Sequence, residues 1–294
     1  MFAAQKIYVK MRDIGILLKF RLAFTVVFSA AAGYLLGMPD FILSQFILLV
    51  LGGFAIVGSS NALNQIMEID TDALMERTKL RPLPAGRMNK SEAYFWALSL
   101  AILGTASLAF LNIPTAVFGV ISMLLYVLVY TPMKSKSPMA VLVGAFPGAI
   151  PFLLGWVAAT GDFGIEAGTL FAIQFLWQFP HFWAIAWVGY DDYAKAGYYL
   201  LPSREKNSTA TYMSIIYTLF MIFVSMLPAF GLTGSLKLSP PAAFIILGLG
   251  IYVLRLAIFH HRNPSDSAAR ALIVSTIVYL PLLQIAYVID NFLI

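Results

Sequence analysis

Residues 93–133 read AYFWALSLAILGTASLAFLNIPTAVFGVISMLLYVLVYTPM and contain no charged side chain. One bilayer crossing needs about 20 consecutive apolar residues, so this run is long enough for two membrane-spanning helices. Asn112-Ile113-Pro114 interrupts the run near its middle, and proline disfavours a helical conformation in the residue that precedes it. The run therefore predicts two transmembrane helices joined by a short turn.

The rest of the chain has the same composition. Hydrophobic residues make up 60% of the 294 residues and charged residues 11%, whereas ordinary soluble domains have about 45–50% and about 25%. The sequence lacks cysteine, which excludes disulfides, thiolate metal sites and a cysteine nucleophile. We therefore expect residues 1–294 to form one polytopic, all-α membrane domain. Further charge-free runs lie at 22–39, 41–67, 137–161, 167–190, 207–236, 238–254 and 271–289.

Nine transmembrane helices are expected from these runs, and the basic residues set their orientation. With nine crossings, 18 of the 19 Lys and Arg residues fall on the N-terminal side and only Lys237 falls on the other. The positive-inside rule then places the N-terminus in the cytoplasm and the C-terminus outside. The helices are expected at about 18–38, 43–66, 92–111, 114–131, 139–159, 168–188, 210–230, 240–259 and 270–290.

The N-terminal segment is not expected to cross the membrane. Residues 1–18 place lysines among apolar residues at helical spacing, which predicts an amphipathic helix lying on the inner leaflet. The same basic residues argue against a secretory signal or targeting peptide, so we expect a bacterial plasma membrane. The net charge of +5 sits in short loops rather than on one face, which argues against nucleic acid as a partner.

A stripe of polar residues ends the second predicted helix. On a continuous helix Asn64, Glu68 and Asp72 share one face with Asn61, whereas Asp70 falls on the opposite side. Polar side chains inside an apolar helix are costly unless they face a cavity or a partner. Because Mg²⁺ takes one or two carboxylates together with phosphate oxygens and water, the stripe predicts a magnesium site. The alternative is a helix end that simply emerges into water.

A basic loop follows this stripe directly. Arg77, Lys79 and Arg81 can bind the phosphate oxygens that a metal ion leaves free, and arginine suits bidentate contact. Carboxylates beside a basic loop are what a metal-bridged diphosphate requires. The plainer interpretation of the loop is positive-inside topology alone.

A second polar stripe ends the sixth predicted helix. Gln174, Gln178, His181 and Asp192 fall on one side of a continuous helix, before any kink at Pro180. Two glutamines and a histidine deep in an aromatic helix are expensive unless they face a cavity. His181 has three interpretations: a core histidine, a hydrogen-bond donor to a substrate, or an iron ligand for a haem.

Both segments resemble one known family. The first is similar to the first aspartate-rich motif of the UbiA superfamily of intramembrane prenyltransferases, through Asn64-x-x-x-Glu68-x-x-x-Asp72 and Glu76-Arg77-Thr-Lys79-x-Arg81-Pro82. The second resembles the haem O synthase branch of that superfamily, through Trp177-Gln178-x-Pro180-His181-Phe182-Trp183 and Asp192-Tyr193-x-x-Ala196-Gly197. The resemblance runs from about residue 15 to 290 and departs from the family pattern at two positions. Glu68 stands where aspartate is usual, and Lys195-Ala196 stands where a second aspartate is expected, so Lys195 is a candidate diphosphate contact in its place.

This resemblance implies an activity and a set of partners. A farnesyl group would pass from farnesyl diphosphate to the 2-vinyl group of haem b, with addition of water, giving haem O and diphosphate. It implies helices bundled around a central cavity open to the cytoplasmic side and the membrane, Mg²⁺ as cofactor, and a haem A synthase downstream. The expected catalytic residues are Asn64, Glu68, Asp72 and Asp192, with Mg²⁺ on Glu68, Asp72 and Asp192. The expected diphosphate-binding residues are Arg77, Lys79, Arg81, Lys134 and Lys195, and the expected acceptor pocket is formed by Asn61, Gln174, Gln178 and His181.

Two other functions stay open at this stage. One is prenyl transfer to an aromatic quinone precursor, which the residues around His181 and the missing second aspartate disfavour. The other is an ion-coupled transporter, whose acidic residues would be expected near the bilayer midplane. Glu68, Asp72 and Asp192 lie instead at predicted cytoplasmic helix ends.

Overall fold

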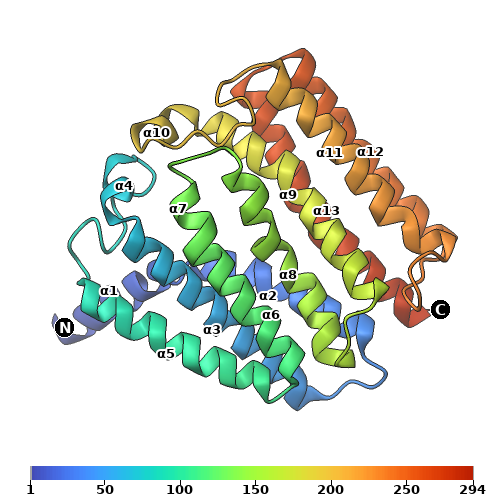
Figure 1. Ribbon diagram of the computed structural model, residues 1–294, viewed down its shortest axis with the longest axis horizontal. Coiled ribbons are helices and arrows are strands. Elements are labelled where there is room, and N and C mark those ends of the chain that lie inside the picture. Colours follow the sequence, from blue (N-terminus) through green and yellow to red (C-terminus); the bar gives the residue numbers. More distant parts are fainter. Residues whose placement is uncertain (1, 294) are drawn as a thin grey trace.

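The computed structural model describes residues 2–293, and it is built from helices that lie side by side in a bundle (Figure 1). Short helices and loops gather at one end of the bundle, where α4 and α10 lie near each other, while the C-terminus lies at the other end. The elements are α1 (Phe2–Leu17), α2 (Phe20–Gly37), α3 (Leu43–Met67), α4 (Ile69–Leu74), α5 (Lys90–Ala109), α6 (Ile113–Leu124), the π-helix η1 (Leu125–Tyr130), α7 (Thr131–Met133), α8 (Ala140–Thr160), α9 (Ile165–Val188), α10 (Tyr190–Lys195), α11 (Ser208–Met226), the 3₁₀ turn η2 (Leu227–Phe230), α12 (Pro240–Arg262) and α13 (Asp266–Leu293).

The membrane character expected from the sequence is confirmed. Within the described residues, eight segments are long and apolar enough to cross a bilayer: α2, α3, α5, α6 through α7, α8, α11 through η2, α12 and α13. The segment expected as a ninth crossing forms the 24-residue helix α9, which is not among these eight because its hydropathy is lower. Gln174, Gln178 and His181 lower it. α9 packs against α8, α11 and α13 inside the bundle.

Local sequence signals explain where the helices begin. The run 93–133 divides as expected, with α5 ending at Ala109 and α6 starting at Ile113. Asn112 caps α6, because its side chain accepts a hydrogen bond from the N–H of Thr115 at 2.8 Å. The amide of Asn112 also donates to the carbonyl of Val157 at 3.0 Å, which ties this turn to α8. Asn89 and Asn207 cap α5 and α11 in the same way.

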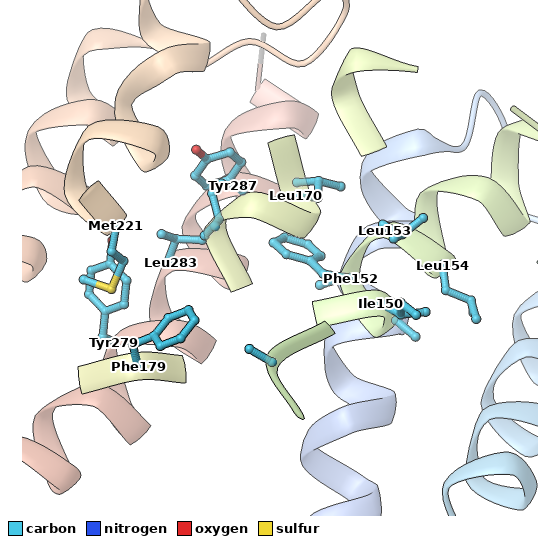
Figure 2. Close-up of a cluster of buried hydrophobic side chains, with 14 of the residues drawn as sticks. Ile150, Phe152, Leu153, Leu154, Leu170, Phe179, Met221, Tyr279, Leu283 and Tyr287 are labelled. Atoms are coloured by element: carbon cyan, nitrogen blue, oxygen red, sulfur yellow. The ribbon is translucent and has the colours of Figure 1, made fainter. Parts of the chain in front are cut away.

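The centre of the bundle is the crossing of α2 and α8. The two helices approach so closely that a Cβ built on Gly155 would lie 1.9 Å from the carbonyl oxygen of Ala30. A Cβ built on Gly33 would lie 2.1 Å from the carbonyl oxygen of Phe152. Around this crossing, α8, α9, α11 and α13 pack large buried side chains such as Phe152, shown in Figure 2. These contacts fix the long helices relative to one another and so hold the loop end in place.

The N-terminal helix α1 is joined to the site helix by two amides. The side chain of Gln65 donates to the carbonyls of Ile16 and Leu17 at 3.1 and 2.7 Å, which satisfies orphan acceptors at the end of α1. Asn61 donates to the carbonyl of Leu18 at 3.1 Å and is 2% exposed. The amide of Asn61 thus holds the α1–α2 turn, and its expected place in an acceptor pocket stays a prediction.

Candidate functional site

The first polar stripe is held by a helix that bends at Glu68. There α3 passes into α4, and Glu68 itself has φ −103° and ψ 15°. The hydrogen bonds from Glu68 N–H to Asn64 and from Asp72 N–H to Glu68 keep the spacing of four residues across the bend. Asn64, Glu68 and Asp72 consequently stay together and are 1%, 5% and 1% exposed, while Asp70 is exposed to solvent. The grouping expected from the sequence is confirmed.

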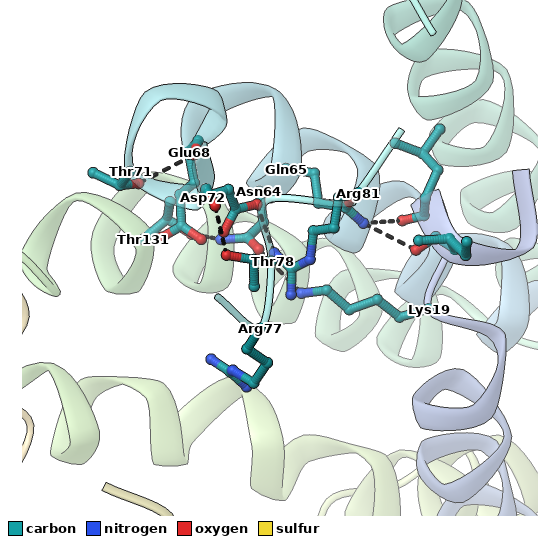
Figure 3. A network of polar contacts seen from close by, with 12 residues as sticks. Lys19, Asn64, Gln65, Glu68, Thr71, Asp72, Arg77, Thr78, Arg81 and Thr131 are labelled. Atoms are coloured by element: carbon teal, nitrogen blue, oxygen red, sulfur yellow. Dashed lines mark hydrogen bonds and ion pairs between the residues drawn. The ribbon is translucent and has the colours of Figure 1, made fainter. Parts of the chain in front are cut away.

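Three cations lie beside these side chains, and Figure 3 shows two of them, Arg81 and Lys19. Lys134 forms an ion pair with Glu68. Arg81 contacts Asp72 at 2.6 Å. Lys19, which the sequence offered only as a topology signal, donates to the side-chain oxygen of Asn64 at 3.1 Å. Because both carboxylates are nearly buried, these pairs provide the charge compensation that burial demands.

Crowding among these cations affects how readily they keep their protons. Burial, followed by the charges of Arg81 and Lys134, lowers the pKa of Lys19 to about 7. Burial also lowers the pKa of Lys134 from its ordinary value, against the opposing effect of Glu68. An anionic ligand entering between these side chains would favour their charged forms. The cluster is thus suited to binding phosphate.

The contacts leave one oxygen of each carboxylate available for a metal ion. Arg81 binds Oδ2 of Asp72, and Oδ1 of the same group is buried without a hydrogen-bond partner. Lys134 pairs with Glu68 through Oε1, and no hydrogen bond from the described residues is made to Oε2. A buried carboxylate oxygen without a partner is costly, and a divalent cation would satisfy it. The donor set of two carboxylates fits Mg²⁺, which completes its shell with phosphate oxygens and water.

A π-helix shapes the wall opposite the carboxylates. In η1 the chain makes one wide turn, a feature that often occurs at functional sites. It ends at Thr131, whose hydroxyl accepts from the amide of Asn64 at 3.0 Å and donates to the carbonyl of Tyr126 at 2.8 Å. One turn further on, Lys134 lies 5.1 Å from the ring centre of Tyr130. The π-helix therefore sets the position of both Asn64 and Lys134.

Asp192 occupies a different place from the one expected. α9 ends at Val188 and Gly189 turns the chain into α10, so the stripe does not continue as one helix. The carboxylate of Asp192 accepts from the backbone N–H groups of Glu76 and Arg77 at 2.8 and 3.2 Å. Although burial acts to raise it, these donors keep the pKa of Asp192 below its ordinary value.

This geometry bears on the metal role expected for Asp192. In the part of the chain that the structure describes, no three His, Asp or Glu side chains are close enough to share an ion. In this arrangement Asp192 lies apart from Glu68 and Asp72, and its expected metal role stays a prediction. The carboxylate of Asp192 fixes the start of the basic loop, because its two oxygens hold main-chain donors.

The expected diphosphate-binding residues form two groups. Arg81 and Lys134 lie in the acidic cluster. Arg77 lies near Asp192, where it donates to the hydroxyl of Tyr193 at 3.0 Å, and Lys195 contacts Asp192 at 3.4 Å. Lys79 pairs with Glu76 on the exposed surface. Only the first group directly faces the carboxylates.

The two glutamines of α9 bind a neighbouring helix. Gln174 donates to the carbonyl of Gly148 and Gln178 to that of Ala145, both at 2.9 Å. A Cβ on Gly148 would lie 2.0 Å from the side-chain oxygen of Gln178, so the amide packs flat against α8. The amide donors of Gln174 and Gln178 are thus used between helices, and their expected place in an acceptor pocket stays a prediction.

His181 keeps one ring nitrogen available. Its Nδ1 lies 2.9 Å from the hydroxyl of Thr276, and that hydroxyl donates its own hydrogen to backbone carbonyls of α13. With this hydroxyl donating to α13, Thr276 would accept from Nδ1, and this assignment of the tautomer would leave the lone pair on Nε2. The ring stacks on Trp177 at 4.8 Å. Among the described residues Nε2 has no hydrogen-bond partner.

Fold and site together are those of a polytopic helical protein with buried carboxylates and cations clustered at one end of its bundle. The sequence matches the UbiA prenyltransferase family over residues 26–278, and the chain belongs to this family. Solved structures agree at the level of the fold. A structure described as digeranylgeranylglyceryl phosphate synthase superposes with a TM-score of 0.79 at 19% identity, covering 97% of this chain and 99% of that one. A UbiA homologue from Archaeoglobus fulgidus bound to GPP and Mg²⁺ superposes with a TM-score of 0.58 at 14% identity, covering 94% and 99%.

Curated relatives specify the branch of the family. The chain is 50% identical to protoheme IX farnesyltransferase of Flavobacterium psychrophilum, over 92% of both chains. It is 51% identical to the protein of the same name from Christiangramia forsetii, over 94% of this chain and 92% of the other. The chain therefore lies on the protoheme IX farnesyltransferase branch.

Proposed function

We propose that this chain transfers the farnesyl group of farnesyl diphosphate to a vinyl group of haem b, making haem O. The observation that carries the proposal is the pair of buried carboxylates, Glu68 and Asp72, each held by a cation through one oxygen while the other stays available. The relatives on this branch are named for that reaction. A haem A synthase would then act on the product.

The residues of the cluster would stabilise the negative charge that develops on the diphosphate as it leaves. Glu68 and Asp72 would hold Mg²⁺, which when bound neutralises negative charge that develops on the departing diphosphate. Arg81 and Lys134 already point into the cluster and would turn from the carboxylates to the phosphate oxygens. As the carbon–oxygen bond of the donor breaks, C1 of the farnesyl group bonds to the terminal vinyl carbon. Water then adds its hydroxyl to the neighbouring carbon and releases a proton.

One assay separates this proposal from its alternatives. Purified protein with farnesyl diphosphate, Mg²⁺ and haem b is expected to produce a haem whose mass has increased by one farnesyl group and one hydroxyl. An aromatic quinone precursor is expected to accept no prenyl group under the same conditions. Prenylation of the quinone precursor alone would support the second enzyme class, and no prenyl transfer to either acceptor would contradict both.

The imidazole of His181 is proposed to contact the acceptor. His181→Ala is expected to alter the absorption spectrum of bound haem and to weaken haem binding, with farnesyl diphosphate affinity almost unchanged. The reason is the lone pair on Nε2, which Thr276 leaves available by binding Nδ1. The control is His261→Ala, which removes an imidazole bound to Thr211 on α11.

The opposite outcomes for His181 are equally specific. A fall in prenyl-donor affinity with an intact haem spectrum would assign the imidazole to the diphosphate. A lower unfolding temperature with both affinities unchanged would make it a structural residue. In that case the loss of the hydrogen bond to Thr276 is expected to lower the free energy of unfolding by about 1–3 kcal/mol.

The topology is proposed to be nine crossings, with α9 as the ninth. α9 is long enough to span a bilayer, and its polar side chains face α8 and α13 rather than lipid. The basic residues then place the N-terminus in the cytoplasm of a bacterial cell, in its plasma membrane. Fusion of alkaline phosphatase after residue 294 is expected to give an active reporter, because this enzyme needs an oxidising compartment. Activity of a cytoplasmic reporter at that position instead would contradict the nine-span topology.

A further inference from the structure

Tyr198 reaches the acidic cluster from the other half of the chain. It follows α10 and is 4% exposed, where it packs with Ala196 against Met75 of the basic loop. Neither acidic motif contains this residue. Its position nevertheless brings a hydroxyl to Glu68, which lies 130 residues earlier.

The hydroxyl of Tyr198 lies between two acceptors. It is 2.8 Å from the hydroxyl of Thr71 and 3.2 Å from Oε1 of Glu68. Thr71 donates its own hydrogen to the carbonyl of Glu68 at 3.1 Å, so it receives rather than gives a hydrogen bond here. The single hydrogen of Tyr198 is therefore shared between Oγ1 of Thr71 and Oε1 of Glu68, and the tyrosine connects the side chain of Glu68, through Thr71, to its own backbone.

Two donors converge on the same oxygen of Glu68. Lys134 pairs with Oε1, the atom that Tyr198 also reaches, and the ammonium of Lys134 lies 5.4 Å from the ring centre of Tyr198. Two contacts from different directions fix the plane of a carboxylate, and they direct the other oxygen, Oε2, away from both donors. Glutamate has one more rotatable side-chain bond than aspartate, so fixing its carboxylate costs more conformational entropy. A second contact therefore does more to hold a glutamate in one orientation.

We propose that Tyr198 is a positioning residue, which holds Oε1 of Glu68 so that Oε2 is presented to the magnesium ion of the donor substrate. The inference rests on the proposed function for the identity of that substrate. It assigns to the loop after α10 a role in metal binding although this loop supplies no ligand itself. Partners that orient a metal ligand typically contribute 10- to 100-fold to metal affinity.

The test measures Mg²⁺ binding separately from turnover. Tyr198→Phe keeps the buried ring and removes the hydroxyl. It is expected to raise the Mg²⁺ concentration needed for half-maximal binding of farnesyl thiodiphosphate, a poorly reactive donor analogue, by about 10- to 100-fold in calorimetric titrations of the full-length protein. Saturating Mg²⁺ is expected to restore most of the turnover rate. Tyr199→Phe, one residue further on at an exposed position, is the matched control and should leave the titration unchanged.

A double-mutant cycle shows whether Tyr198 acts through Glu68. In a Glu68→Asp background the shorter side chain withdraws from Tyr198, so adding Tyr198→Phe is expected to change Mg²⁺ affinity by no more than about twofold. An equal effect in both backgrounds would overturn the proposal, as would a lower unfolding temperature with unchanged Mg²⁺ affinity. If the wild-type protein binds the analogue with Mg²⁺ but never farnesylates haem, the proposed function fails while the role of Tyr198 stands.

Discussion

Replacement of Asp72 by asparagine is expected to slow farnesyl transfer by about 100- to 1,000-fold, the range found when one preorganised electrostatic contact is removed. The side chain keeps its shape but loses the charge that pairs with Arg81 and the oxygen that lacks a partner. Both losses weaken Mg²⁺ binding at the diphosphate. The measurement is the rate of farnesyl transfer to haem b at saturating substrates, together with a Mg²⁺ titration.

Asp70 provides the control for this expectation. It lies two residues away on the same short helix, but its side chain is exposed and outside the cluster. Asp70→Asn should therefore retain activity within about twofold, as is usual for surface substitutions. A loss equal to that of Asp72→Asn, at matched expression, would contradict the assignment of the site to one face of the helix.

Substitution of Gly155 by alanine is expected to destabilise the fold strongly. The added Cβ would lie 1.9 Å from the carbonyl oxygen of Ala30 and 2.6 Å from the nitrogen of Tyr34. Both are backbone atoms, so no side chain can turn away and the helices α2 and α8 must separate. Overpacking of a core usually lowers the free energy of unfolding by about 1–3 kcal/mol. We expect the loss here to lie at or above the upper end of that range, because backbone atoms cannot move aside as a side chain can. The measurement is the unfolding temperature of the detergent-purified protein.

A second glycine within a helix serves as a control that separates the effect of crowding on stability from the effect of helix propensity. Gly168 lies in α9 and a Cβ built there meets nothing within 4 Å. Gly168→Ala is expected to be neutral or slightly stabilising, since alanine favours a helix over glycine by up to about 1 kcal/mol. Similar unfolding temperatures for the two variants would show that the α2–α8 crossing tolerates more separation than its geometry implies.

Much of the fold follows from features that act over short stretches of sequence. Charge-free runs predicted the long helices, and Asn112-Ile113-Pro114 placed a turn where α6 begins. The grouping of Asn64, Glu68 and Asp72 followed from helical spacing alone, since the bend at Glu68 preserves the hydrogen bonds between residues four apart. Such features depend on neighbouring residues, and these are visible in the sequence.

The remaining site residues depend on contacts between distant parts of the chain. Helical spacing placed Asp192 with His181, but the turn at Gly189 directs it to the backbone of residues 76 and 77. Gln174 and Gln178 looked like pocket residues because buried amides need partners, and the sequence does not show that α8 supplies them. Tyr198 reaches its partner across 130 residues, and no local pattern distinguishes it from Tyr199.

The partners of α9 also bear on the order in which the protein is assembled. Trp177 donates to the carbonyl of Thr276 at 2.7 Å, and His181 contacts the hydroxyl of the same residue, 99 and 95 positions later in the chain. Translation delivers α9 to the insertion machinery well before α13 exists. The carbonyls of α8 are already present at that time, so Gln174 and Gln178 can form their hydrogen bonds as α9 enters the membrane. Trp177 and His181 can form theirs only after α13 has been inserted. The nascent chain thus completes this part of its bundle only when its last helix arrives, and loss of that helix would leave α9 poorly retained in the bilayer.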